Sequence, residues 1–227
     1  MLKRTGPGAR LYNVLRLCSA VLAGSCLLMA DSADQLIQRV EKRYNGARTL
    51  SVNFVESYSV QGHRCRPEAG TLTLRKQGKM RWDYTQPQGK LFISDGKNVY
   101  LYTAVDNRVE KVGLKDTEDM RAPLAFLLGR LDMKKEFRAF EVHGAQAGNW
   151  LEASTRNDRV PYEKVEMLIA PDASIQRLKV AGRDDSELSF WFANEKVNPP
   201  APEELFRFKI PAGAEVVESV GLGAGEN

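Results

Sequence analysis

Cysteine and histidine, from which many metal and nucleophile sites are built, are scarce in this sequence. It contains three cysteines and two histidines, and neither His63 nor His143 has a partner at a spacing typical of a metal site. The Gly-x-Ser-x-Gly, Walker and Cys-x-x-Cys motifs are absent from it. Cys65 follows His63 by two residues, but two neighbouring loop residues cannot supply the base, orienting group and oxyanion donors of acyl transfer. We therefore expect no metal, no cofactor and no enzymatic activity.

Acidic residues are absent from the first 30 positions, which carry four basic residues, Lys3, Arg4, Arg10 and Arg16. An apolar run from Leu17 to Ala30 follows, and polar residues 31–34 end it. A basic start, a short apolar run and small residues at its end are typical of a secretory signal peptide. The run is shorter than the roughly 20 residues of a membrane-spanning helix. We predict that residues 1–30 are a signal peptide cleaved near Ala30.

Two other interpretations of this segment stay open. Without cleavage it would anchor the chain in a membrane. Alternatively, residues 23–26 form a loose lipobox ending at Cys26, so a lipid on that cysteine is the second alternative. Alanine is unusual at the first position of a lipobox, and the residues after Cys26 are more apolar than a lipoprotein linker. Both features count against a lipid on Cys26.

Net charge is missing from the rest of the chain. Removing the four basic residues of the first segment leaves 29 Lys and Arg against 29 Asp and Glu, with no block of one sign. A neutral body exerts little long-range attraction on a polyanion, so we expect no nucleic-acid partner.

Internal disulfides and domain linkers are missing as well. Cys65 is the one cysteine after the predicted signal peptide, so the fold must rest on its hydrophobic core. We find no repeat and no linker, and therefore predict one domain over residues 31–211. The chain ends in a Gly-rich stretch, residues 221–227, and we predict a flexible tail over residues 212–227.

The first element after the signal peptide has the pattern of an amphipathic helix. Ser32 followed by Gln35 fits a capping box. Apolar side chains then recur at spacings of three and four, at Leu36, Ile37, Val40 and Tyr44, and Gly46 is a plausible helix end. A second helix-like segment follows Pro123, where Leu124–Leu128 is apolar on nearly all sides.

From Ser51 onward, apolar residues recur at every second position, which predicts antiparallel strands with one apolar and one wet face. Turn residues separate these alternating runs. The last run contains Phe206, Phe208 and Ile210. A sheet of about ten strands tends to curl. We predict an α+β, mainly β fold: a large curled antiparallel sheet, or unclosed half-barrel, with a lid of two or three helices on the concave side.

Several motifs follow one another in an ordered series. Gly70–Tyr84 contains a G-x-L-x-L strand, a basic turn and a W-x-Y strand, and Pro87 follows. A turn at Ser94–Lys97 then leads into an aromatic strand that ends at Tyr102. Phe54 lies ahead of this block in an F-x-E motif, and residues 206–213 close the series with F-x-F-x-x-P-x-G. In this order the motifs resemble those of the LolA family over almost the whole exported chain.

The resemblance implies a periplasmic, monomeric carrier that binds the acyl chains of lipoproteins. It would receive this cargo from an inner-membrane ABC-type lipoprotein-release complex and deliver it to an outer-membrane acceptor, without catalysis. The alternative on the same fold is a periplasmic binder or sensor of another lipid, such as a glycolipid or lipopolysaccharide. An interaction module without a cavity and an uncharacterised hydrolase are further alternatives.

The alternation and the resemblance together identify candidate residues. The candidate lipid-binding side chains of the concave face are Phe54, Leu72, Leu74, Met80, Trp82, Tyr84, Val99 and Leu101, and those of the lid are Phe126, Leu127 and Leu131. Alternation alone leaves open that each is an ordinary core residue. In the family, an arginine of the basic turn latches the lid to the sheet. Lys76 occupies that position here, one step after Arg75, so either side chain is a candidate latch.

Overall fold

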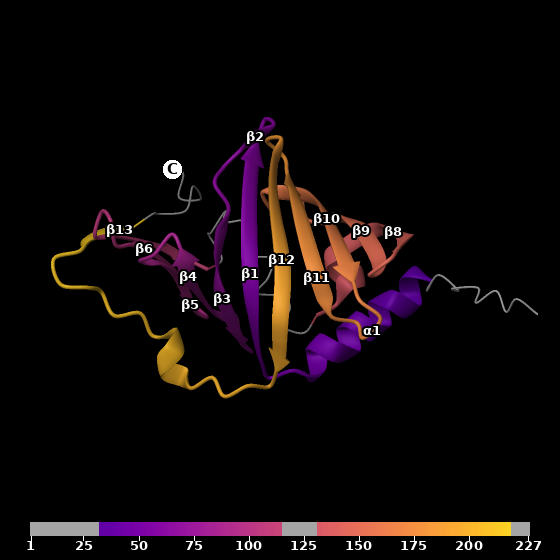
Figure 1. Cartoon of the computed structure of the whole chain (residues 1–227), viewed down its shortest axis with the longest axis horizontal. Coiled ribbons are helices and arrows are strands. Elements are labelled where there is room, and N and C mark those ends of the chain that lie inside the picture. The colour runs from indigo at the N-terminus through magenta and orange to yellow at the C-terminus, as the bar shows by residue number, and fades with distance from the viewer. Residues whose placement is uncertain (1–31, 115–130, 219–227) are drawn as a thin grey trace, which may run out of the picture.

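The structure, a computed structural model, describes residues 32–114 and 131–218 (Figure 1). The first described part contains helix α1 (Ala33–Gly46) and strands β1 (Thr49–Val60), β2 (His63–Arg64), β3 (Glu68–Arg75), β4 (Lys79–Gln86), β5 (Lys90–Asp95), β6 (Asn98–Thr103) and β7 (Arg108–Gly113). The second contains α2 (Met133–Glu136), β8 (Phe137–Ala145), β9 (Gly148–Thr155), β10 (Tyr162–Ile169), β11 (Ile175–Gly182), β12 (Ser186–Val197), the 3-10 helix η2 (Glu203–Phe206) and β13 (Glu215–Glu218). The predicted signal peptide and the apolar helix of Leu124–Leu128 lie outside the described residues.

The described strands form one sheet built from two antiparallel meanders. Its order is β13-β7-β6-β5-β4-β3-β1-β12-β11-β10-β9-β8, and β2 pairs with β1 beside this path. The long central strands β1 and β12 pair along most of their length and so join the first meander to the second (Figure 1). Strands β8 and β13 end the order on opposite sides. The sheet is thus large, curled and unclosed, which confirms the predicted fold class.

One strand pair departs from the antiparallel rule. β13 pairs with β7 in parallel, with Val216 opposite Val109. The chain reaches this edge by crossing the sheet after β12, so it approaches β7 in the same direction. The sheet therefore continues to Glu218, beyond the domain end that the sequence led us to place at residue 211.

Helix α1 forms as the sequence predicts. The Ser32 side chain accepts a hydrogen bond from the backbone N–H of Gln35, whose side chain accepts one from the Ser32 N–H, which completes the capping box. The stripe of Leu36, Ile37, Val40 and Tyr44 is buried. Gly46 is the last helical residue and Ala47 takes the cap position, one residue later than expected. Figure 1 shows α1 against the half of the sheet formed by β8–β11.

The core lies on the face of the sheet that α1 covers, which we call the inner face. Residues opposite one another in the register, such as Leu72, Trp82, Phe92 and Leu101, share this face. The cluster continues through both meanders and includes Met167, which is fully buried. No helix in residues 32–114 and 131–218 is long and apolar enough to cross a membrane.

The opposite, outer face of the first meander is covered by residues 198–214, which we call the strap. Arg75 Nη1 donates to the carbonyl oxygen of Ala201 at 2.9 Å, and Arg81 Nη1 to that of Leu205 at 3.1 Å. The Phe208 ring stacks on Tyr100, with ring centroids 5.2 Å apart. The yellow strap is visible in Figure 1 as it runs from the end of β12 to β13.

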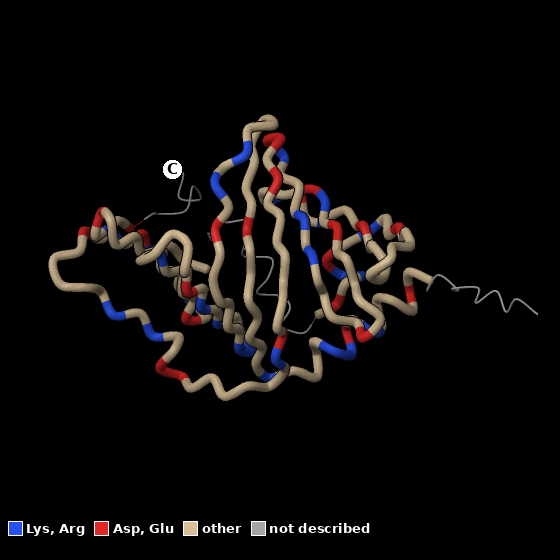
Figure 2. The backbone as a smooth tube through the Cα atoms, viewed as in Figure 1, with Lys and Arg blue, Asp and Glu red and all other residues tan. Residues whose placement is uncertain are grey.

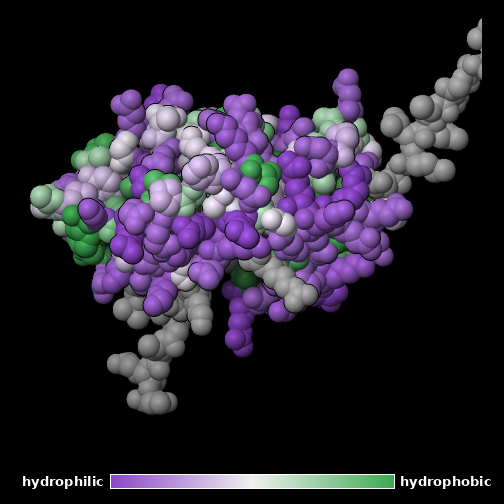
Figure 3. Space-filling view, turned by 90° about the horizontal axis from the view of Figure 1, so that it is seen from below, coloured by the Kyte–Doolittle hydropathy of each residue, from purple (hydrophilic) through white to green (hydrophobic). Residues whose placement is uncertain are grey.

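The strap corrects one expectation from the sequence. The alternation of Phe206, Phe208 and Ile210 predicted a strand, but the structure has η2 followed by irregular backbone. Phe206 is buried and Ile210 is exposed. Phe206 and Phe208 pack against the face of the sheet, but the backbone of residues 198–214 does not pair as a strand. Seen from below, the surface is mostly hydrophilic, with a hydrophobic group at the end where β13 lies (Figure 3).

Candidate lipid-binding face and latch

The candidate side chains from the first meander lie together on the inner face. Seven of the eight are buried members of the hydrophobic core, and Leu101 is half-buried against it. Leu131, predicted for the lid, is buried in the same cluster. Phe126 and Leu127 lie outside the described residues. The sheet register explains the gathering, because Leu74 is opposite Met80, Met80 opposite Ser94, and Ser94 opposite Val99.

Aromatic rings form the centre of this face. Trp82 is fully buried, with the Phe54 ring edge-on at a centroid distance of 4.8 Å and the Phe190 ring at 5.4 Å. Tyr84 meets Phe54 edge-on at 5.1 Å. Such edge-on pairs are favoured by the ring quadrupoles, beyond the burial of apolar area. The face is therefore a connected aromatic and aliphatic surface.

Gly70 is required where β3 passes close to β4. A Cβ placed on Gly70 would lie 2.1 Å from the carbonyl oxygen of Asp83, far inside van der Waals contact. The β3–β4 register shifts at this point, between Ala69 and Gly70. A side chain here would push the strands apart, so the first residue of the G-x-L-x-L motif is needed for close strand approach.

One polar atom on the inner face is left without a partner. The Trp82 indole Nε1 is buried and has no hydrogen-bond acceptor among the described residues. A buried unsatisfied donor costs about 1–3 kcal/mol. The indole N–H is thus a donor available to an acceptor brought onto this face.

Lys76 connects the sheet to α1 and to Leu131. Its Nζ donates to the backbone carbonyl oxygen of Asn45 at 2.9 Å, at the end of α1. The Asn45 side chain then pairs with the Leu131 backbone in both directions, accepting from its N–H at 2.7 Å and donating to its carbonyl at 2.8 Å. Arg75, by contrast, points to the strap, where Ala201 accepts its hydrogen bond. The two candidate latch residues therefore lie on opposite faces, and Arg75 is not placed to replace Lys76.

A second polar cluster attaches α1 to β12 and β11. Arg43 donates to Glu195 Oε1 from Nε at 2.9 Å and Nη2 at 2.6 Å. Tyr44 OH donates to Glu195 Oε2 at 2.9 Å and accepts from the Ile175 N–H at 2.9 Å. Burial raises the pKa of Tyr44, and the Glu195 carboxylate raises it further. The phenol is thus kept neutral as a donor, and α1 is held at both sides of its last turn.

Among the described residues, the side chains of α1 pack closely against those of the central strands. One cavity there is bounded by Tyr44, Leu50, Val52, Leu72, Leu74, Ile175, Phe192 and Glu195 and holds about 10 Å³. This is room for one water molecule at most. The wide apolar hollow expected from the sequence stays a prediction; around this small cavity the side chains pack against one another, which we call the closed arrangement.

Several residues of this site were not identified from the sequence. Leu50 and Val52 follow the same alternation as Phe54, so that signal was present. Phe92 lies in the continuous apolar run Leu91–Ile93, where alternation cannot choose a face. Asn45 and Glu195 carry no sequence signal, because their partners Leu131 and Tyr44 are 86 and 151 residues away in the chain.

The described residues offer no metal centre. They contain no group of three or more His, Cys, Asp or Glu side chains able to hold a metal ion. His63 lies on β2 and His143 on β8, two strands on different parts of the sheet. Cys65 is exposed.

Fold and inner face together define an unclosed half-barrel with an apolar, helix-covered face. The family model described as outer membrane lipoprotein carrier protein LolA matches residues 45–209, more than half of the chain. The chain therefore belongs to the LolA family, as the motif order indicated.

Individual relatives agree with this assignment. The chain is 29% identical over 216 residues to the outer-membrane lipoprotein carrier protein of Bordetella avium, covering 91% of this chain and 98% of that protein. It is 24% identical over 205 residues to the protein of the same name from Nitrosomonas europaea, covering 89% and 98%. A solved structure of an uncharacterized conserved protein from Thermus thermophilus shares the fold, with a TM-score of 0.50, 14% identity, and coverage of 83% of this chain and 100% of that one.

Proposed function

We propose that this protein is a periplasmic carrier that binds the acyl chains of lipoproteins and ferries them from the inner to the outer membrane without catalysis. An inner-membrane ABC-type release complex would be the donor and an outer-membrane protein the acceptor. Membership of the LolA family and the names of the relatives support lipoprotein as cargo. The acyl-binding site is the inner face, with Phe54, Leu72, Met80 and Trp82 at its centre.

The connected apolar inner face is the observation that carries this proposal. Burial of an acyl chain gains about 0.8 kcal/mol for each methylene, or about 10 kcal/mol for a dozen. In the closed arrangement the same side chains already bury one another. Cargo must therefore replace contacts such as Phe54–Trp82, and the net gain is smaller than the gross one. This competition keeps cargo binding reversible, as a carrier requires.

Uptake of an acyl chain requires part of the inner face to separate from α1, which covers it. The Lys76–Asn45–Leu131 contacts hold together the β3–β4 turn, the end of α1 and the chain that leads into α2. We assign Lys76 as the latch, because its side chain makes the hydrogen bond that joins the turn to α1, while its backbone N–H donates to the Arg48 carbonyl oxygen beyond the helix. The Arg43–Glu195 and Tyr44–Glu195 bonds keep α1 attached to β12 at the same time. On this proposal the helix stays docked on β12 while the β3–β4 turn moves away from it.

The Trp82 indole N–H gives the site a polar preference. Lipoprotein acyl chains are attached through ester and amide groups, whose carbonyl oxygens accept hydrogen bonds. A carbonyl that reached the inner face would satisfy the Trp82 donor, which lacks a partner among the described residues. An accepted hydrogen bond there removes an existing penalty, so it adds affinity without a competing internal bond.

The proposal is tested with the exported chain and the apolar fluorophore bis-ANS. We expect bis-ANS fluorescence to rise on binding, and a diacylated lipopeptide to reverse the rise while the same peptide without lipid does not. Failure of the lipopeptide to compete would contradict the carrier function. Native mass spectrometry of protein taken from its own periplasm then identifies the cargo, and a glycolipid or lipopolysaccharide mass would favour the alternative function on this fold.

A further inference from the structure

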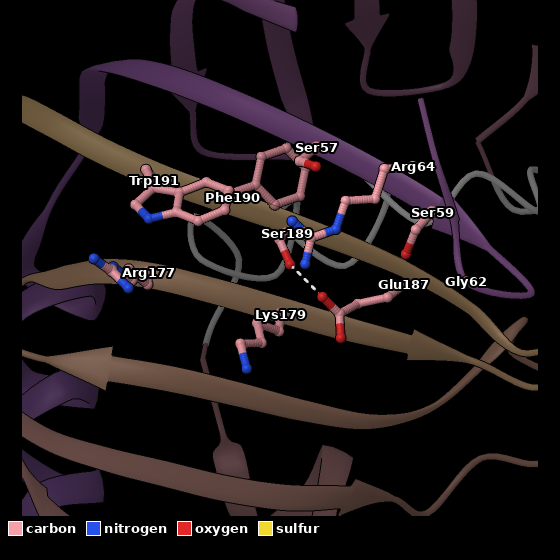
Figure 4. A pocket seen from close by; sticks show the side chains of 10 residues that line it. All are labelled: Ser57, Ser59, Gly62, Arg64, Arg177, Lys179, Glu187, Ser189, Phe190 and Trp191. Carbon is pink, nitrogen blue, oxygen red and sulfur yellow. Dashed lines mark hydrogen bonds between the residues drawn. The ribbon is translucent and has the colours of Figure 1, made fainter. Parts of the chain in front are cut away.

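A groove lies on the outer face of the sheet, away from the proposed lipid site. It has a volume of about 490 Å³ and is lined by residues of β1, β2, β11 and β12 (Figure 4). Its floor is formed by small side chains, because Ser57 of β1 lies opposite Ser189 of β12. Longer side chains rise on both sides, with Arg64 opposite Ser59 on the β2 side and Lys179 opposite Ser189 on the β11 side. The groove is hollow because its floor has short serine side chains while the strands on both sides carry long ones.

The groove carries two guanidinium groups that the described residues do not neutralise. Among residues 32–114 and 131–218, no side chain or carbonyl accepts a hydrogen bond or ion pair from Arg64 or Arg177. Lys179 is paired with Glu166 at 3.2 Å, and the Glu187 carboxylate accepts from the Ser189 hydroxyl at 2.7 Å. Figure 4 shows Arg64 extended over the floor towards Ser189, with Arg177 and Lys179 along the other side. The groove therefore has an excess of positive charge held in planar, fork-shaped donors.

One end of the groove is apolar. Trp191 is 40% exposed and Val55, directly opposite it, is 43% exposed. The Arg177 guanidinium lies over the Trp191 ring, 5.6 Å from its centroid. Tryptophan and arginine are both enriched among the residues that contribute most to binding at protein interfaces. Along β1 the groove extends from the position of Val55 to that of Ser59, which is four residues or about 13 Å at the rise of a strand.

We propose that this groove binds an extended, acidic segment of a partner protein. Two carboxylates of the segment would each receive paired hydrogen bonds, one from Arg64 and one from Arg177. An apolar residue would cover Trp191 and Val55, while the Ser57, Ser59 and Ser189 hydroxyls would meet the segment backbone. This inference does not depend on the lipid site, since the groove is on the other face of the sheet.

The surroundings favour a narrow acidic segment over an anionic membrane. Beside the groove, Glu166 lies opposite Lys179 and Glu152 opposite Glu166, so carboxylates follow directly on the adjacent strands. Figure 2 shows acidic and basic positions intermingled over this half of the sheet. A flat anionic surface would meet these carboxylates together with the arginines, whereas a segment one strand wide contacts the groove alone.

Fluorescein-labelled peptides test the proposal on the intact exported chain. The probe is an eight-residue peptide with glutamate at alternate positions and a terminal leucine, and its control has glutamine in place of glutamate. We expect the glutamate peptide to bind and to change the tryptophan fluorescence of the protein. The glutamine peptide should bind at least about tenfold more weakly, and added salt should weaken binding. The double variant Arg64→Ala/Arg177→Ala should lose at least about tenfold in affinity for the acidic peptide.

Matched variants keep the outcome interpretable. Arg159→Ala removes the same type of exposed charge outside the groove lining and should leave binding unchanged. Glu187→Gln removes the carboxylate that competes with the peptide and should tighten binding. Equal binding of the two peptides, or an unchanged affinity in the double variant with an intact circular dichroism spectrum, overturns the proposal. So does full competition by inorganic phosphate at peptide concentration, or preferential binding to phosphatidylglycerol vesicles over the peptide.

Discussion

Lys76 donates a hydrogen bond from Nζ to the backbone carbonyl oxygen of Asn45, 2.9 Å away, and so joins the β3–β4 turn to the end of α1. The Asn45 side chain passes the connection on to the Leu131 backbone. Its neighbour Arg75 lies on the opposite face, against the strap. Lys76 and Arg75 therefore offer a test of the latch, because substitutions of these two adjacent cations should have different effects.

Lys76→Ala should shift the protein towards an open, cargo-binding arrangement. Loss of one hydrogen bond of a charged group removes about 1–2 kcal/mol from the closed form, which changes the equilibrium roughly 5- to 30-fold. We expect stronger bis-ANS binding and faster lipopeptide uptake, measured by stopped-flow fluorescence. Lys76→Arg should restore the original behaviour. Arg75→Ala is the control and should leave uptake unchanged; an equal effect of both substitutions would remove the latch assignment.

Tyr44→Phe should destabilise the protein by about 1–3 kcal/mol, because the Glu195 carboxylate and the Ile175 N–H both lose a partner in a buried place. Urea unfolding measures the change. Tyr100→Phe is the matched control: its ring stacks on Phe208, and no hydrogen bond of its hydroxyl is found in the described residues. Its stability should differ from that of the unsubstituted protein by less than about 0.5 kcal/mol.

The Tyr44 hydroxyl also predicts a pH dependence. Burial, and then the Glu195 charge, raise the pKa of Tyr44 in the folded protein above that of the unfolded chain. The unfolded tyrosine ionises near about pH 10, so its contribution to stability is complete below that pH and is lost as the pH rises above it. The difference in unfolding free energy between the unsubstituted protein and Tyr44→Phe should therefore shrink above about pH 10. A constant difference between pH 8 and pH 11 would contradict the assignment.

Trp82→Phe should reveal whether the unpartnered indole N–H recognises a cargo carbonyl. The substitution keeps an aromatic ring and removes the donor. We expect the substitution to weaken binding of an ester-linked diacyl lipopeptide more than binding of its ether-linked analogue, which lacks the ester carbonyl. The difference between the two losses should be roughly fivefold. Both ligands lose the same ring contacts, so the ratio isolates the hydrogen bond. An identical loss for both ligands would show that Trp82 acts by packing alone.

Phe206→Ala should detach the strap. Phe206 is 1% exposed, and truncation of a buried phenylalanine costs about 3–5 kcal/mol where the site cannot collapse. Hydrogen exchange should then accelerate in β13 and β7, which the strap brings together. Ile210→Ala, at a position 54% exposed, is the control and should leave exchange rates unaltered. Unchanged protection of β13 in Phe206→Ala would mean that β13 holds itself without the strap.

Local patterns in the sequence were sufficient for α1 and for the inner face. Ser32, Gln35 and the stripe from Leu36 to Tyr44 specify the helix through contacts no more than four residues apart. Strict alternation placed Phe54, Leu72 and Trp82 on one face, because side chains of a strand point alternately to its two faces. Whether these residues bind lipid stays a prediction, since alternation is the same for a core and for a binding face.

The sequence by itself determined the capped helix and the apolar inner face, since each follows from periodicity within one element, and the number of strands and the order of the motifs indicated the half-barrel class. The tertiary structure alone decided that Lys76 and Arg75 serve opposite faces, that Tyr44 meets Glu195, and that Phe206 anchors a strap. It also decided that Arg64 and Arg177 line one groove. These relationships join residues far apart in the chain, and they depend on the order and register of the strands, which no local pattern encodes.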